Sequence, residues 1–297
     1  NKNELFYASV YIIPNLRHET IHWFFGGKDM IYADYHLHTN FSSDSTAEMT
    51  AMIDKAVNIG LKEIMFTDHM DIEFPDKSMP FTLFYQDYSE AINLYKVLYM
   101  KQIDVLIGVE MGLQRHIVRE ARMFTEYNPF DFVIGSIHVI DGIDVSNPEY
   151  FKGKTKKQAY LKYFEEVLEN LKIHDCYNVV GHLDYISRYA PYDDKSVYYN
   201  EYREIIDEIL KVLVKKDKGL DVNTSAYRYG ENRCYPQFEI LKRFNELGGK
   251  IITVGSDAHS PEYMADHFED AYNMIKSAGF KSIATFRNKN VNFIDIK

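Results

Sequence analysis

Seven short apolar runs, each followed by a longer segment, set the strongest limit on how this chain can fold. The runs occupy residues 31–36, 63–68, 103–110, 130–138, 177–182, 219–224 and 250–257. Helical periodicity is found between them, at residues 46–60, 86–101, 154–173, 197–216 and 235–247. Repeated strand–helix units of this kind build a parallel sheet. Since α/β barrels of about this length form one domain, we expect residues 30–297 to be a single barrel domain.

Residues 1–29 differ from the rest of the chain. They are apolar and aromatic but are interrupted by Pro14 and by charges, so they lack the pattern of a signal peptide. Met30 stands directly before the first predicted strand. We expect residues 1–29 to be an N-terminal extension or a remnant added for expression, with a short helix that packs on the domain as the alternative.

Ionisable side chains end six of the seven predicted strands. Along the chain they are His36 and His38, then Asp68 and His69, Glu110, His138, His182 and Asp184, and finally Asp257 and His259. The sixth strand ends instead in Asn223 and Thr224. Because the carboxyl ends of parallel strands open onto one face of a barrel, these residues are expected to ring one pocket.

Histidines are concentrated at these strand ends. A single histidine that closes a strand is usually structural, but six of the eleven histidines are placed in this way. Residues two apart on a strand point to the same side, so His36 and His38 can converge on one point. Imidazoles and carboxylates together are typical of a metal site.

Composition limits the partners of the chain. A net charge of −10 disfavours nucleic acid or an anionic membrane surface as the main partner. No apolar run is long enough to span a membrane. The two cysteines, Cys176 and Cys234, form no disulfide or metal-binding pattern, which fits a reducing cytoplasm.

Seven segments, in order from residue 34 to residue 262, together resemble the PHP (polymerase and histidinol phosphatase) metallohydrolases. They read DYHLHTNFSSDS, FTDHMD, IGVEMG, FVIGSIHVIDGID, VVGHLDYISRY, DVNTSAYR and ITVGSDAHSPE. The segments GSIHVIDG, GHLDYISRY and NTSAYR are most similar to the histidinol-phosphatase branch. The resemblance implies a distorted (β/α)7 barrel with three divalent metal ions, which are zinc, manganese or iron.

The resemblance also implies the ligands of each metal. The first would be held by His36, His38, Glu110 and Asp257, the second by Glu110, His138 and His182, and the third by Asp44, His69 and His259. Many relatives have a histidine in the place of Asp44. Carboxylate oxygen is a harder ligand than imidazole, so the third site is expected to favour manganese or iron over zinc, or else to be weakly occupied.

The implied activity is metal-dependent hydrolysis of L-histidinol phosphate to L-histidinol and phosphate, a step of histidine biosynthesis. Three divalent ions with Asp44, Glu110 and Asp257 leave a positive site, which suits a dianionic phosphate monoester. His259 or Asp184 is expected to protonate the leaving group, and Asp68 to orient a ligand histidine.

Further residues are expected to contact the substrate. Arg188, Arg228 and Asn223 follow strand ends, and the planar fork of arginine fits phosphate oxygens. Asp71 or Glu73 could meet the ammonium or imidazole group. The alternative for the two arginines is a surface ion pair with acids such as Asp184 or Glu231.

Two competing functions remain open. A PHP-fold phosphoesterase could act on nucleotides or on another small phosphate monoester, but a nucleic-acid substrate would call for a basic groove. A non-catalytic metal-binding or partner-binding module would be expected to lose ligands. The full set of candidate ligands in this chain therefore favours catalysis. The sequence does not indicate an oligomeric state.

Overall fold

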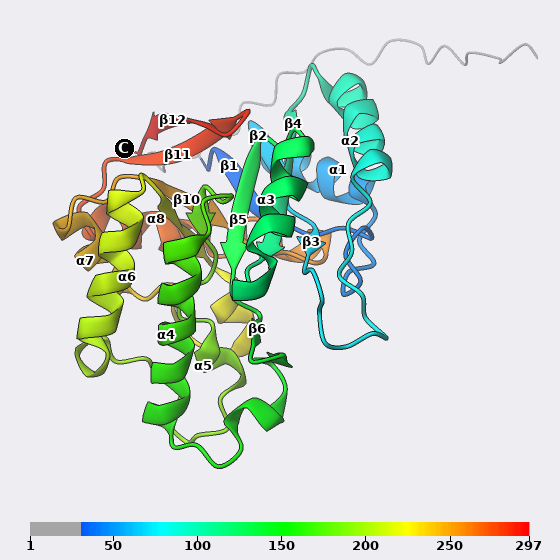
Figure 1. The fold of residues 1–297 in the computed structure, drawn as a ribbon. Coiled ribbons are helices and arrows are strands. Elements are labelled where there is room, and N and C mark those ends of the chain that lie inside the picture. Colours follow the sequence, from blue (N-terminus) through cyan, green and yellow to red (C-terminus); the bar gives the residue numbers. More distant parts are fainter. Residues whose placement is uncertain (1–30, 297) are drawn as a thin grey trace, which may run out of the picture.

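The computed structural model describes residues 31–296, so the expectation for residues 1–29 concerns a segment outside the described residues. Seven parallel strands follow one another around a barrel (Figure 1). They are β1 (Ala33–Leu37), β2 (Glu63–Phe66), β4 (Asp104–Gly112), β5 (Phe132–Ser136), β8 (Val179–Val180), β9 (Gly219–Asn223) and β10 (Ile252–Gly255). The seven predicted strands and the (β/α)7 class are confirmed.

The barrel closes between its first and last strands only near their carboxyl ends. A parallel bridge joins Leu37 to Ala258. The N–H of His38 donates to the carbonyl of Ala258 at 3.0 Å, and the N–H of Asp257 donates to the carbonyl of His36 at 2.8 Å. The distortion of the barrel therefore lies at this seam, which also carries several of the predicted ligands.

Helices surround the barrel. They are α1 (Met49–Ile59), α2 (Tyr85–Tyr99), α3 (Val118–Tyr127), α4 (Lys156–Ile173), α5 (Ile186–Tyr189), α6 (Arg203–Lys215), α7 (Phe238–Glu246) and α8 (Phe268–Ser277). The five predicted helices are present, although α6 begins later than predicted because a 3-10 turn occupies Tyr199–Glu201. Helices α3, α5 and α8 were not predicted. In the described part of the chain, no helix is both long and apolar enough to cross a membrane.

The amino-terminal end of the barrel is closed by apolar side chains. The hairpin of β11 (Ser282–Arg287) and β12 (Asn290–Asp295) covers this end (Figure 1), and Phe286 packs with Tyr35 and Phe132 inside it. The N–H of Phe286 donates to the Tyr35 hydroxyl at 2.9 Å. This hairpin was not predicted from the sequence. Because one end is filled, the pocket of the barrel lies at the other.

A break in the regular alternation of β1 turns its histidines inward. The pairing register of β1 with β2 shifts between Asp34 and Leu37, as in a β-bulge. Tyr35 belongs to the interior cluster, whereas Leu37 packs in the layer outside the barrel. The intervening His36 also faces the interior, because its Nε2 lies 3.2 Å from Glu110. Two consecutive side chains thus enter the barrel.

Two short elements extend the carboxyl end of the barrel. Strand β3 (His69–Met70) pairs with β4 beyond the end of β2, so that His69 lies opposite Glu110. The hairpin of β6 (Val139–Ile140) and β7 (Ile143–Asp144) follows β5. Both elements bring polar side chains to the rim of the pocket.

Candidate metal centre

Glu110 is at the centre of the pocket. Its side chain is 1% exposed, and Ser136 donates a hydrogen bond to its Oε1 at 2.6 Å. The two carboxylate oxygens lie 2.9 to 3.4 Å from ring nitrogens of His36, His38, His69, His138 and His182. A carboxylate that faces imidazoles on both of its oxygens has the arrangement of a ligand shared between two metal ions.

Asp257 completes the first predicted site. Its Oδ1 lies 3.4 Å from Nε2 of His38 and 3.8 Å from Nε2 of His36. The backbone of Asp257 has a φ of 55°, a region that costs an ordinary residue of order 1–3 kcal/mol and is found at functional sites. Arg228 donates to the carbonyl oxygens of Ser256 and Asp257, both at 2.7 Å, and so supports this conformation.

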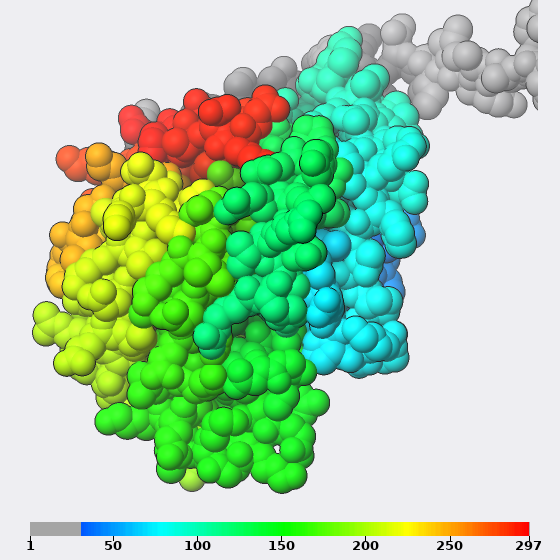
Figure 2. Space-filling view, viewed as in Figure 1, coloured from blue at the N-terminus to red at the C-terminus, as the bar shows by residue number. Residues whose placement is uncertain are grey.

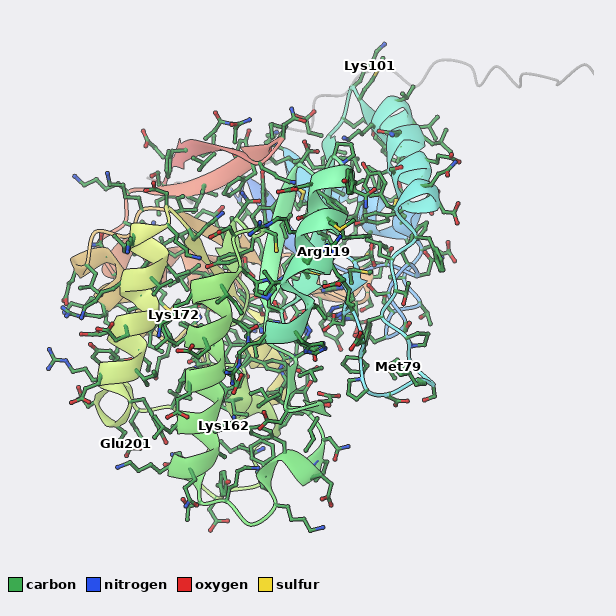
Figure 3. The ribbon with its side chains drawn as sticks, in the orientation of Figure 1. Met79, Lys101, Arg119, Lys162, Lys172 and Glu201 are labelled. Atoms are coloured by element: carbon green, nitrogen blue, oxygen red, sulfur yellow. The ribbon has the colours of Figure 1, made fainter. Side chains whose placement is uncertain are left out.

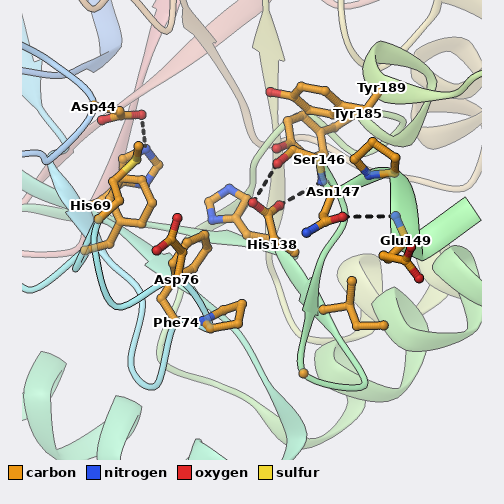
Figure 4. A pocket seen from close by; sticks show the side chains of 17 residues that line it. Asp44, His69, Phe74, Asp76, His138, Ser146, Asn147, Glu149, Tyr185 and Tyr189 are labelled. Carbon is orange, nitrogen blue, oxygen red and sulfur yellow. Dashed lines mark hydrogen bonds and ion pairs between the residues drawn. The ribbon is translucent and has the colours of Figure 1, made fainter.

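Asp44 lies between His69 and His259. Its Oδ2 is 3.0 Å from Nε2 of His259 and 3.6 Å from Nε2 of His69 (Figure 4 shows the pair with His69). The side chains of Asp44 and His259 are each about 30% exposed. The third predicted site is therefore more open to solvent than the sites around Glu110.

Several polar atoms of this pocket have no hydrogen-bond partner although they are buried. They are Nε2 of His36 and His38, Nδ1 of His69 and His182, Oε2 of Glu110 and Oδ2 of Asp71. Leaving a buried polar group unpaired costs about 1–3 kcal/mol. Together with His138, His259 and Asp257, these residues form five overlapping groups with ligand atoms within 4.8 Å of one another. Bound cations would satisfy these atoms, so the residues present fit a centre with several metal ions.

The electrostatics of the pocket lead to the same conclusion. Burial disfavours an imidazolium, yet Asp71 and Glu110 raise the pKa of His138 to about 10. Burial opposes a charged His36 as well, but Glu110 and Asp257 raise its pKa well above the usual value. The carboxylates therefore attract positive charge, which metal ions or ring protons can supply. Burial and the rings of His259 and His69 lower the pKa of His38 to about 3, so His38 stays neutral.

A second set of polar residues orients the candidate ligands. The Nδ1 of His36 lies 2.9 Å from Oδ2 of Asp221, and the Nδ1 of His138 lies 2.8 Å from Oδ1 of Asp71. A carboxylate in this position fixes the tautomer, so that Nε2 of each ring is left to bind metal. The sequence reading missed Asp221. Its position in the sequence could have indicated this role. Asp221 lies two residues before Asn223 on β9, so both side chains are on the same side of the strand.

Asp68 contacts residues that lie beside the candidate ligand histidines. It accepts hydrogen bonds from the Oγ atoms of Thr39 and Ser42, at 2.9 and 2.7 Å. Ser42 Oγ in turn lies 3.3 Å from Nδ1 of His38 and accepts from the N–H of His69 at 3.0 Å. Asp68 is fully buried. It does not reach the pocket itself, and its contacts fit a residue that positions ligand histidines.

The two residues expected to act as proton donors, Asp184 and His259, have other partners in the structure. Asp184 is fully buried and does not line the pocket; its Oδ2 accepts from Arg233 at 2.6 Å and from the N–H of Gln237 at 3.2 Å. His259 faces Asp44 with Nε2, while its Nδ1 lies 2.9 Å from the carbonyl oxygen of Asp257. Because a carbonyl only accepts, Nδ1 carries a proton. Burial opposes a second proton on the ring, but Asp44, which faces Nε2, raises the pKa of His259 above its usual value.

Three residues expected to contact the substrate also have other partners in the structure. Asn223 is fully buried, and its Oδ1 accepts from the N–H and hydroxyl of Ser225. Asp71 is engaged with His138, as described above. Glu73 lies 3.0 Å from His116 at the surface and does not line the pocket. The sequence pattern alone does not distinguish side chains that line the pocket from side chains that lie behind its wall.

Arg188 lies at the pocket wall within a group of aromatic rings. Its guanidinium carbon is 4.3 to 5.9 Å from the ring centroids of Tyr185, Tyr189, Tyr229 and Tyr235. One Nη donates to Ser225 and lies 3.5 Å from Oδ2 of Asp257, whereas the buried Nε has no partner. The ion pair with Asp184 and Glu231 that was considered for Arg188 or Arg228 is formed instead by Arg233.

The pocket has two adjoining compartments that share Asp44, His69, His138, Tyr185 and Tyr189. The metal compartment, of about 580 Å³, is also lined by Glu110, His182, Asp257, His259, Arg188 and Arg228. The outer compartment, of about 880 Å³, contains Phe74, Asp76 and Phe81 on one side and Asp144, Ser146, Asn147 and Glu149 on the other (Figure 4). Among the described residues, no lysine or arginine lines the outer compartment.

The family model of the PHP domain matches residues 34–225, more than half of the chain. The chain belongs to the PHP domain family. A histidinol-phosphatase of Lactococcus lactis subsp. lactis is 37% identical to it over 260 residues, which cover 87% of this chain and 96% of that protein. A protein named probable histidinol-phosphatase, of Clostridium acetobutylicum, is 35% identical over 253 residues, or 84% of this chain and 95% of that protein.

A solved structure resembles this PHP protein over nearly its whole length. It is the crystal structure of histidinol phosphate phosphatase from L. lactis, complexed with zinc, L-histidinol and phosphate. The TM-score is 0.82 at 38% sequence identity, with 88% of this chain and 98% of that chain covered. The resemblance to the histidinol-phosphatase branch of the family is thereby confirmed.

Neutralising the carboxylate behind His36 is expected to weaken metal binding. In Asp221→Asn the strong acceptor for Nδ1 of His36 is lost, and removal of such an outer ligand costs about 10- to 100-fold in metal affinity. Zinc titration of the chelator-treated protein measures the change. Asp217→Asn, at an exposed position after α6, is the matched control. Equal affinities for the two variants would contradict the orienting role of Asp221.

Metal affinity is expected to rise with pH. The pKa of His138 is raised to about 10 in the absence of metal, so a metal ion must displace protons from the site. Below that pKa each increase in pH removes the competitor and strengthens binding. Calorimetric zinc titrations in buffers of different ionisation enthalpy count the protons released. Release of no protons near neutral pH would contradict this view of the site.

Proposed function

We propose that this protein is a histidinol-phosphate phosphatase, which hydrolyses L-histidinol phosphate to L-histidinol and phosphate. The observation that carries the proposal is the group of buried histidines and carboxylates around Glu110, in a chain that is 37% identical to a histidinol-phosphatase. The relative with bound zinc, L-histidinol and phosphate supports the same substrate. The proposed cofactors are three divalent ions, with zinc as the first candidate for the two sites around Glu110.

The metal compartment would bind the phosphoryl group. Divalent ions there would lower the pKa of a bound water and neutralise charge on the phosphoryl oxygens. Glu110 holds the ring nitrogens in place, and the buried Nε of Arg188 provides a donor with no other partner. Since Arg228 already donates to two carbonyl groups, its proposed role is to hold Asp257 while its side chain lines the compartment.

The outer compartment would receive the organic part of the substrate. L-Histidinol carries an ammonium group and an imidazole, and so it is a cation near neutral pH. The carboxylates of Asp76, Asp144 and Glu149 give this compartment a negative lining. The rings of Tyr185 and Tyr189 lie where the two compartments meet and offer faces to a cation or an imidazole. These features favour a cationic alcohol over a nucleotide, whose further phosphates would meet carboxylates.

The proposal is tested by measuring phosphate release from L-histidinol phosphate, an aryl phosphate and a panel of nucleotides. We expect a strong preference for L-histidinol phosphate and loss of activity with a chelator. Arg188→Lys should lower kcat/KM by roughly 100-fold, as does the loss of one donor to a developing charge. Arg243→Lys, at a partly buried ion pair with Asp207 outside the pocket, is the control. Activity on nucleotides alone would reject the substrate.

We also propose that residues 30–297 form a single PHP metallophosphatase domain and that the enzyme acts in the cytoplasm. Two free cysteines, one of them the buried Cys234, fit a reducing compartment. The family match begins at residue 34, beyond the segment in question. A shortened chain that begins at Met30 is expected to keep its activity and its unfolding temperature. Loss of folded protein on this truncation would show that residues 1–29 belong to the domain.

A further inference from the structure

Helix α2 is apolar on two opposite sides. Tyr88 and Ile92 are fully buried against the barrel. On the other side, Leu94, Val97 and Leu98 are 56%, 66% and 60% exposed. Their spacing of three and four residues places them in one stripe along the helix. We call Leu94, Val97, Leu98 and the following Met100, which is 66% exposed, the α2 stripe.

The α2 stripe lies far from the metal centre. Helix α2 ends at Tyr99, shortly before β4 begins at Asp104, so its last turns stand beside the amino-terminal end of the barrel. Figure 3 labels Lys101 at the tip of this part of the chain, at the end of the molecule away from Met79. The same part of the chain stands out at the edge of the molecule in Figure 2. The pocket opens at the opposite, carboxyl end of the strands. The stripe is therefore not a part of the substrate site.

The charges at the two ends of the α2 stripe are complementary. Glu90 is exposed one turn before Leu94, and Lys101 is exposed one turn after Val97. The midpoint between positions 94 and 97 is also the midpoint between positions 90 and 101. If two such helices pack antiparallel about a two-fold axis at this midpoint, Leu94 of each copy meets Val97 of the other, and Glu90 of each meets Lys101 of the other.

We propose that the α2 stripe is the interface of a homodimer, in which a second copy of this chain packs with its own α2 antiparallel to the first. A two-fold interface uses the same patch on both copies, so a patch must be complementary to itself, and the pairs Leu94–Val97 and Glu90–Lys101 meet this condition. Antiparallel helices also place opposite ends of their dipoles together. Since one helix face is smaller than a standard interface, the dimer would be weak, with a Kd in the micromolar range.

Sedimentation equilibrium of the full chain over a range of concentrations tests the proposal. We expect a reversible monomer–dimer equilibrium. Val97→Glu, which brings two carboxylates close to the axis, should leave only monomer at the same concentrations. The matched control is Leu161→Glu, a partly exposed leucine on α4, which should dimerise as the wild type does. The unfolding temperature of each variant shows that the fold is retained.

A charge exchange separates this arrangement from other contacts. Glu90→Lys alone and Lys101→Glu alone should each weaken the dimer, because like charges then meet across the axis. The two changes together restore two pairs of opposite charges and should recover the wild-type Kd. Failure of the double variant to recover would overturn the antiparallel pairing.

Other occupants of the stripe give different results. A wild-type chain that stays monomeric up to roughly millimolar concentration would overturn the proposal. If residues 1–29 covered the stripe instead, the full chain would be monomeric and the chain beginning at Met30 would dimerise, which would also overturn it. Phosphatase activity of Val97→Glu reports on the metal centre separately, so failure of the dimer does not decide the proposed function.

Discussion

The contact between the Glu110 carboxylate and five imidazole rings is the interaction on which the rest of the pocket depends. A buried carboxylate is unfavourable unless it is paired, and neighbouring rings lower the pKa of Glu110 well below its usual value although burial opposes this. The rings in turn require fixed orientations. Asp221, Asp71 and the Asp68–Ser42 pair provide them from outside the first layer of ligands.

The two ends of the barrel differ in the polarity of the side chains that fill them. Apolar side chains and the β11–β12 hairpin fill the amino-terminal end, whereas histidines and carboxylates occupy the carboxyl end. Close packing leaves little freedom between these layers. A Cβ on Gly255 would clash with Cβ of His36, and a Cβ on Gly112 would clash with the carboxylate of Asp71. The small residues therefore allow the strands to approach and the ligands to keep their positions.

Sequence alone predicted the parallel barrel and the residues that gather at its carboxyl end, because strand periodicity and strand ends are local signals. It could not predict which of those residues face the pocket. Asp184 and Asn223 end strands as the candidate ligands do, yet Asp184 accepts a hydrogen bond from Arg233 and Asn223 accepts one from the N–H of Ser225, two residues further along the chain. Asp221 was missed because its partner, His36, is 185 positions away. The β11–β12 hairpin lies beyond the last predicted unit and carries no motif.

The unpaired atoms around Glu110 also affect the stability of the protein in the cell. Burying such groups without cations lowers the free energy of unfolding. Ligands that bind only the folded state, such as metal ions at this site, raise it by mass action. The metal supply would then influence how long the protein survives as well as its rate of turnover of substrate. In a metal-poor cell, the unloaded molecules would unfold more often and be degraded first.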